Sequence, residues 1–193
     1  MYSIHIQPIS TPGDGNCFYH AVYQAIYAKQ ATKETILSFK YELSQQITLS
    51  NLLLLGHEFQ AILYKCLETN KELQEFVDKD FALSLQHPDI LEYIDSILPK
   101  FKEHIQTDGI WPNDWAQQFC SLCLKYNIIV YLHESKKMTP ISPIIQKYNC
   151  ILLFNKCNTH WETAQIQLRN KETNTIEKTG TICSYDIIQK YLQ

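Results

Sequence analysis

The sequence lacks the features that mark several large classes of protein. Its 17 Lys and Arg residues against 20 Asp and Glu give a formal net charge of −3, so it has no basic excess for binding nucleic acid or an anionic membrane. No uninterrupted apolar run approaches the roughly 18 residues of a membrane span, and residues 1–10 lack the basic and apolar regions of a signal peptide. We therefore expect no nucleic-acid partner, no membrane partner and a cytoplasmic location.

Disulfide-like cysteine spacing and internal repeats are absent as well. The seven cysteines form an odd set, and most of them lie in apolar stretches where a reduced thiol packs as a small hydrophobic residue. This usage is typical of a reducing compartment such as the cytosol. The chain has 193 residues, 45% of them hydrophobic, which is enough to bury a core, and we expect one domain spanning residues 1–193.

The apolar pattern predicts helices first and strands later. One helix begins at or just after Cys17, and several short helices follow between residues 33 and 107, with breaks near Gly56, Asn70 and Pro88. A helix over 114–126 leads into a strand over 127–133. Further strands are expected at 148–155 and 160–168, then a polar connection at 168–180 and a short helix at 185–192. This order is typical of an α+β fold with a small sheet.

The segment TPGDGNC brings a polar turn to Cys17 at the start of a helix. Gly13 and Gly15 allow the backbone to bend tightly, so that the N–H groups of Asp14, Gly15, Asn16 and Cys17 converge as an oxyanion hole. We expect the positive end of the helix dipole, and a histidine that the fold brings alongside, to lower the pKa of the Cys17 thiol. The alternative is a small residue in the core, and the presence of a partner histidine decides between the two.

His160 is the histidine best placed to pair with Cys17. It follows the turn-like NKCNT segment at the start of a predicted strand, and Glu162 lies two residues later on the same face of that strand. A carboxylate there orients the imidazole and stabilises its charged form, although an edge strand beginning with HWE also fits a purely structural role. His20 lies one turn inside the Cys17 helix, where a packed or surface histidine fits better than a base. Core or solvated positions are expected for the remaining histidines, which are His5, His57, His87, His104 and His133.

The CSLC segment, residues 120–123, has the spacing of half a zinc site. It lies on one predicted helix and has no second well-spaced pair, so a packing role is favoured. We expect neither a metal nor a cofactor.

Taken together, these segments resemble the OTU (ovarian tumour) family of papain-like cysteine proteases, which remove ubiquitin. The resemblance rests on DGNCFY before a helix, on a Trp, helix and IxVY block, and on a late strand with a histidine, an aromatic and an acidic residue. It covers about Thr11 to Gln165. It implies the α+β papain-like OTU fold, with a helical arm over 33–107. It also implies a monomeric, thiol-dependent deubiquitinase that binds ubiquitin or polyubiquitin. If the protein is a viral or bacterial effector, it is expected to act in the host cytosol.

The resemblance also implies roles for individual residues. Cys17 is the nucleophile, His160 is the general base and then acid, and Asp14 is the motif acid that supports the cysteine loop. Family members usually carry Asp or Asn two places after the histidine, so Glu162 is a departure, and Asp14 is able to share or replace its role. Trp161 is expected to point to the opposite face of the strand and pack.

Substrate contacts are implied only loosely. The elements that hold ubiquitin in the family correspond here to the arm over 33–107 and the loops Ile4–Gly13 and Asn155–Thr159. A narrow channel around the glycine tail of ubiquitin would need aromatic lining, for which the candidates are Trp111, Trp115 and Trp161. Two other functions fit the same residues: a protease for another ubiquitin-like modifier or a polyprotein, and a catalytically silent ubiquitin-binding module, which Glu162 keeps open.

Overall fold

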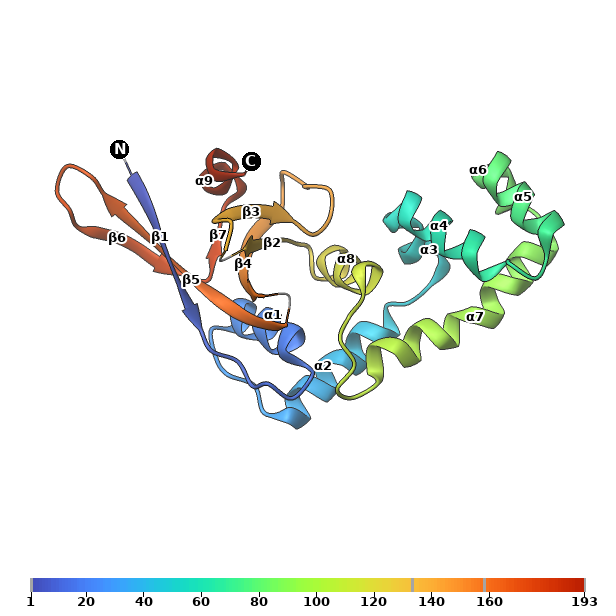
Figure 1. Cartoon of the computed structure of the whole chain (residues 1–193), viewed down its shortest axis with the longest axis horizontal. Helices are drawn as coiled ribbons and strands as arrows, with labels where there is room; N and C mark the ends of the chain where they lie inside the picture. Colours follow the sequence, from blue (N-terminus) through green and yellow to red (C-terminus); the bar gives the residue numbers. More distant parts are fainter. Residues whose placement is uncertain (1, 133, 158, 193) are drawn as a thin grey trace.

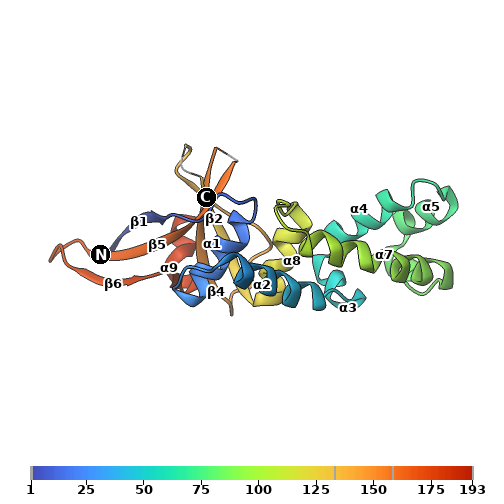
Figure 2. The ribbon, with the colours of Figure 1, turned by 90° about the horizontal axis from the view of Figure 1, so that it is seen from below.

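The computed structural model describes residues 2–132, 134–157 and 159–192 of the chain. Within these residues a sheet and α1 (Cys17–Tyr27) form one end of the molecule, and a group of helices extends from it as an arm (Figure 1). The view from below shows the arm running along the long axis of the molecule (Figure 2). The expected α+β fold is confirmed. His133, the last residue of the strand expected over 127–133, lies outside the described residues. So does Asn158, which belongs to the expected loop Asn155–Thr159.

The described strands form one seven-stranded sheet. Its main order is β1 (Tyr2–Ile9), β5 (His160–Asn170), β4 (Asn149–Lys156), β2 (Tyr126–Leu132) and β3 (Lys137–Pro140), with β6 (Ile176–Gly180) beside β5 and β7 (Ile182–Cys183) beside β4. The β2–β4 pair is parallel and the other named pairs are antiparallel. The three predicted strands are confirmed as β2, β4 and β5.

Two segments that the sequence assigns to loops are strands in the structure. Residues 176–180, expected within a polar connection, form β6 because they pair with the far end of β5 as an exposed hairpin ribbon. Within the expected loop Ile4–Gly13, the first residues belong to β1, whose eight positions all pair with β5. Pro8 is accommodated there because β1 is the edge strand of the sheet, where a missing N–H costs no ladder hydrogen bond.

The helices between the first and second strands are interrupted near Gly56, Asn70 and Pro88, as the sequence predicts, and also between Gln45 and Leu49 and at Asp80, where no break is predicted. In chain order they are α2 (Lys33–Gln45), α3 (Leu49–Leu52), the 3-10 turn η1 (Leu53–Leu55), α4 (His57–Cys66), α5 (Lys71–Lys79), α6 (Phe81–Ser84) and α7 (Pro88–Gln106). The Asn70 side chain accepts the N–H of Leu73 and so caps α5, and Pro88 occupies the first turn of α7, where its missing N–H is not needed. The later helices are α8 (Asp114–Leu124), α9 (Tyr185–Ile188) and the 3-10 turn η2 (Gln189–Tyr191).

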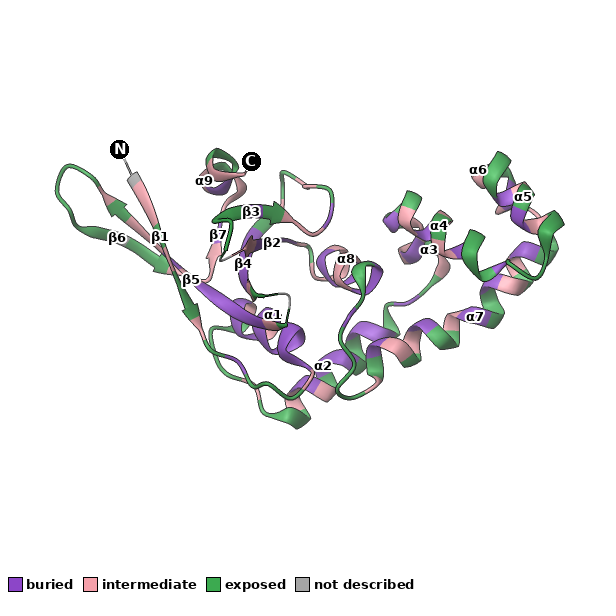
Figure 3. Cartoon of the chain, in the orientation of Figure 1, coloured by how far each residue is buried: buried purple, intermediate pink, exposed green. Residues whose placement is uncertain are grey.

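The central strands are buried on both faces (Figure 3). In β4, Ile151 and Leu153 join the large core that contains α1 and the arm helices, whereas Leu152 and Phe154 join a second core that contains Ile188 of α9. This double burial explains why residues 148–155 read as a continuous apolar run instead of an alternating one. A bilayer-spanning helix, judged by length and apolar character, is not found among the described residues.

Candidate active site

The packing of α1 against β5 brings Cys17 next to Trp161, the residue that follows His160. Cys17 is the first residue of α1, and His160 is the first residue of β5. The Phe18 ring packs edge-on against the Trp161 ring with centroids 5.3 Å apart, and the Thr163 hydroxyl donates to a backbone carbonyl of α1 at 2.8 Å. The Cys17 sulfur is close enough to the backbone N–H of Trp161 to be stabilised by it. The thiol therefore lies beside the residue that directly follows His160.

The segment before the cysteine is fastened to the same strand. The Thr11 hydroxyl donates a short hydrogen bond to the Trp161 carbonyl, and both residues are buried. Trp161 thus contacts the cysteine segment through its backbone and its ring, while its neighbours His160 and Glu162 share the other face of β5, as the strand period predicts. The turn and the strand are held together on both sides of Cys17.

Burial raises the pKa of the Cys17 thiol in this structure. The N–H groups of Trp161, Phe18 and Cys17 itself act in the opposite direction, and the negative charge of Asp14 adds to the rise. The N–H groups at the helix start act in the expected direction, but the loss of solvent around the sulfur outweighs them, so the expected net lowering is not found. A raised pKa favours the thiol form of Cys17, so a base is needed to remove its proton before it reacts.

The Glu162 carboxylate lies between the imidazole of His160 and the ammonium group of Lys156. Its Oε1 is 4.0 Å from Nε2 of His160, and its Oε2 is 2.8 Å from Nζ of Lys156. The first contact is at ion-pair distance, too long for a hydrogen bond, and the second is an ion pair without well-directed hydrogen-bond geometry. Lys156 is directly opposite His160 in the β4–β5 register. Sequence reasoning missed Lys156, although its position just before the hairpin turn is a usable signal.

Asp14 pairs with His20 and supports the cysteine turn. Its Oδ1 accepts the backbone N–H of Asn16 at 3.0 Å, and its Oδ2 lies 3.2 Å from Nε2 of His20, which is buried. Partial burial acts to raise the pKa of Asp14, but the Asn16 N–H and His20 outweigh it and leave the pKa below its usual range. His20 is thus a packed residue, as predicted, with a specific partner that the sequence did not reveal. The carboxylate that faces His160 is Glu162.

The turn before Cys17 requires glycine at one position, and one of its backbone N–H groups is already hydrogen-bonded within the turn. Gly15 has a φ of 81°, and a Cβ added there would lie 2.5 Å from the carbonyl oxygen of Gly109. A Cβ at Gly13 would meet nothing within 4 Å, so the predicted need for glycine holds at residue 15 and is wrong at residue 13. Because the Asn16 N–H donates to Asp14, it is not free to bind an oxyanion in this conformation, which corrects its expected place in the hole.

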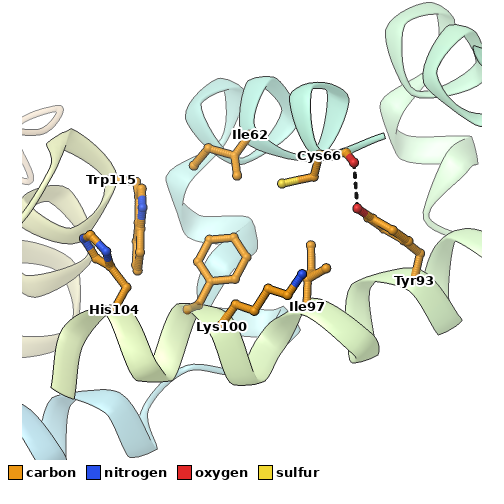
Figure 4. A pocket seen from close by; sticks show the side chains of 8 residues that line it. Ile62, Cys66, Tyr93, Ile97, Lys100, His104 and Trp115 are labelled. Atoms are coloured by element: carbon orange, nitrogen blue, oxygen red, sulfur yellow. Dashed lines mark hydrogen bonds between the residues drawn. The ribbon is translucent and has the colours of Figure 1, made fainter. Parts of the chain in front are cut away.

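The three tryptophans have different surroundings. Trp161 is buried against Phe18, and Trp111 is exposed in the segment that follows Gly109. Trp115 lines a pocket of about 390 Å³ between α4, α7 and α8, with His104 beside it and Cys66 and Tyr93 at the far end (Figure 4). No proposed catalytic residue lines this pocket.

The CSLC segment lies in α8, where Cys120 is buried and Cys123 is half-buried. In the described part of the chain, no three His, Cys, Asp or Glu side chains are grouped so as to hold a metal ion.

A thiol at a helix start, with a histidine and a carboxylate on the adjacent strand, is the arrangement of a papain-like cysteine protease. Residues 12–179 match the model of the OTU-like cysteine proteases, and the chain belongs to that family.

Solved structures of OTU domains share the fold. An ovarian tumour (OTU) domain in complex with ubiquitin has a TM-score of 0.50 and 14% identity, over 90% of this chain and 74% of that chain. The viral OTU domain protease from Farallon virus has a TM-score of 0.51 and 12% identity, over 83% of this chain and 84% of that chain. Comparison with curated protein sequences gave no match.

Proposed function

We propose that this protein is a deubiquitinase, a thiol-dependent isopeptidase that cleaves the bond between the ubiquitin C-terminus and a lysine side chain. The observation that carries the proposal is the position of the Cys17 sulfur against the Trp161 N–H, next to His160. Membership of the OTU-like cysteine proteases supports the chemistry. The ubiquitin complex of an OTU domain with the same fold supports ubiquitin as the partner. We infer action in a cytosol, which is the host's if the protein is an effector.

The first half of the reaction forms an acyl-enzyme. Because Nε2 of His160 faces Glu162, Nδ1 is the nitrogen left to take the Cys17 proton. The sulfur then attacks the carbonyl carbon of ubiquitin's C-terminal glycine, and the carbonyl oxygen becomes an oxyanion. We assign its stabilisation to the backbone N–H groups of Asp14, Gly15 and Cys17. As the C–N bond breaks, the imidazolium gives its proton to the leaving lysine nitrogen.

The second half returns the enzyme to its thiol form. His160, now neutral, takes a proton from water, and the resulting hydroxide attacks the thioester carbonyl carbon. The same N–H groups hold the second oxyanion, and the sulfur leaves and regains the proton from the imidazolium. Glu162 assists both halves because its charge stabilises the imidazolium that forms in each.

Cleavage of isopeptide-linked diubiquitins, followed by gel, tests the activity. We expect the wild type to release monoubiquitin from at least one linkage type and the Cys17→Ala variant to release none. The matched control is Cys123→Ala, a half-buried cysteine on α8, which should cleave within about twofold of the wild type because its thiol has no part in the reaction.

The same experiment separates the two alternatives. A wild type that binds ubiquitin but cleaves no diubiquitin and no ubiquitin amide is a silent binding module, and the proposed activity is then wrong. Fluorogenic amides made on the tails of other ubiquitin-like modifiers test the second alternative. A preference of more than tenfold for one of them over ubiquitin would move the substrate away from ubiquitin while leaving the cysteine chemistry intact.

A further inference from the structure

A lysine is buried beneath the turn that carries the nucleophile. Lys40, on α2, is fully buried, and its Nζ donates to Oδ1 of Asn16 at 2.8 Å and to the Thr107 carbonyl at 2.7 Å. Its Nζ also lies 4.8 Å from the centroid of the Tyr19 ring. No carboxylate of the described residues forms an ion pair with it, which is unusual because buried lysines are rare unless paired. The buried ammonium group of Lys40 therefore holds the Asn16 side chain in place.

Asn16 is the point at which three segments meet. Its buried side chain accepts from Lys40 and from the Gly109 N–H at 3.3 Å, and donates to Oδ1 of Asp108 at 2.8 Å. These bonds fasten the turn before Cys17 to α2 and to the segment 107–109. The close approach of Gly15 to Gly109 follows from the same contact.

These bonds also keep Asn16 from its usual role. An asparagine that precedes a helix ordinarily caps it by accepting the N–H of the second or third helical residue. Asn16 precedes α1 but makes no such bond, and its Oδ1 accepts from Lys40 and Gly109 instead. The first N–H groups of α1 are consequently left for other acceptors, and those of Cys17 and Phe18 stabilise the sulfur.

We propose that Lys40 is a positioning residue for the nucleophile turn, residues 14–17: by holding the Asn16 side chain away from α1, it keeps the N–H of the second helical residue, Phe18, free for the sulfur. The role rests on the proposed cysteine chemistry, since it acts only through Asn16 and touches no substrate.

Protonation of Lys40 controls the strength of this link. Burial lowers the pKa of Lys40 to about 8, against the carboxylates of Asp108 and Asp14, which act to raise it. The other ionisable groups facing this cluster are Lys33, 2.6 Å from Asp108, and His104 on α7, whose pKa is lowered by burial and then by Lys40. Above pH 8 the donor becomes neutral, and its bonds to Asn16 and Thr107 weaken because charge-assisted hydrogen bonds are the stronger kind.

The test compares the wild type with Lys40→Met on ubiquitin carrying a C-terminal coumarin amide. At pH 7 we expect kcat to fall by about 10- to 100-fold, the range for losing a hydrogen bond to a charged donor, with KM within about twofold. The ratio of the two kcat values should shrink toward unity above pH 8, where the wild type loses the same charge. Taking the ratio removes the pH dependence of the reaction itself, which both proteins share.

Lys33→Met is the matched control, because it removes an exposed charge from the same helix and from the same aspartate. It should change kcat by less than about twofold. A Lys40→Met variant with wild-type kcat at pH 7, or a kcat ratio that does not change with pH, overturns the proposal. An equal loss in Lys33→Met also overturns it, because the effect would then belong to charge near Asp108 in general.

A measurement on the unaltered protein covers the case in which Lys40→Met does not fold. In NMR titrations of the wild type, the side-chain amide of Asn16 and the carbonyl carbon of Thr107 should shift together with a midpoint near pH 8. Signals that stay constant between pH 7 and 9.5 contradict the role. If the wild type has no activity on any ubiquitin substrate, it is the proposed function that fails, whereas an active wild type with an indifferent Lys40→Met refutes only the role of Lys40.

Discussion

Replacing Glu162 with Gln removes one charge from the site and keeps the size of the side chain. The carboxylate is 6% exposed and lies 4.0 Å from Nε2 of His160, so its charge acts directly on the imidazolium that forms during the reaction. Lys156 holds the other carboxylate oxygen and opposes that effect. The variant therefore leaves His160 facing a lysine without its counter-charge.

The magnitude follows from these distances. Two unit charges 4.0 Å apart attract by about 4 kcal/mol at the effective dielectric constant of about 20 that suits sites near a protein surface. His160 is 26% exposed and Lys156 is 47% exposed, so solvent screening and the lysine charge cancel much of this. A net loss of about 1–2 kcal/mol remains, which corresponds to a decrease in kcat/KM of roughly tenfold.

The assay is the pH profile of kcat/KM on a ubiquitin amide, measured for Glu162→Gln, Lys156→Met and the double variant. Glu162→Gln should lose about tenfold, Lys156→Met should stay within about threefold, and the double variant should recover part of the loss because the unpaired lysine charge is gone. A Glu162→Gln profile identical to that of the wild type would show that Glu162 does not orient His160. That role would then pass to Asp14 or to water.

Three further predictions concern the turn and its supports. Gly15→Ala should lower the free energy of unfolding, measured in urea, by about 3 kcal/mol, because its Cβ meets the Gly109 backbone at positive φ. Gly13→Ala should change the free energy of unfolding by no more than about 0.5 kcal/mol. Equal effects of the two substitutions would contradict the described turn. Burial lowers the pKa of Lys40 from 10.5 to about 8, so the unfolded chain binds more protons than the folded chain between those pH values. The stability of the wild type relative to Lys40→Met should therefore rise by up to about 3 kcal/mol from pH 8 to 10.5. A fall in this stability difference would refute the burial of the charge. The pKa of Asp14 is lower in the folded state than its unfolded value of 3.8, so the ionised carboxylate stabilises the fold above that pH. The stability advantage of the wild type over Asp14→Asn should be present at about pH 6 and shrink as the pH falls through the folded pKa. An advantage that grows in acid would show that the pairing with His20 is not stabilising.

The sequence predicts most of the elements that position the site because those elements follow from local patterns. The helix at Cys17 and the strand at His160 depend on apolar spacing and turn residues, which are visible in one segment at a time. The alternation of Ile4 and Ile6 was a usable signal for β1, and Pro8 is the residue that obscured it. Nothing local marks β6, whose polar residues are strand only because β5 extends beside them.

The contacts that support the site join segments distant in the chain, and local patterns do not reveal them. The bond from Lys40 to Asn16 spans 24 positions, and the bond from Asn16 to Asp108 spans 92. A lysine on a helix is ordinarily expected to be solvated, even between Phe39 and Tyr41, and only the packed structure shows Lys40 buried beneath the nucleophile turn. The direction of the pKa shift at Cys17 is likewise a property of packing, because burial, which sequence does not give, outweighs the N–H groups.

The proposed pairing of Cys17 with His160 is tested most directly by mapping a covalent adduct. Wild-type protein is incubated with ubiquitin that carries a C-terminal electrophile, and the modified peptide is identified by mass spectrometry. The described arrangement predicts that ubiquitin is attached to Cys17 alone among the seven cysteines, and that His160→Ala slows attachment at least tenfold. Attachment at another cysteine, or a His160→Ala variant that reacts as fast as the wild type, would contradict it.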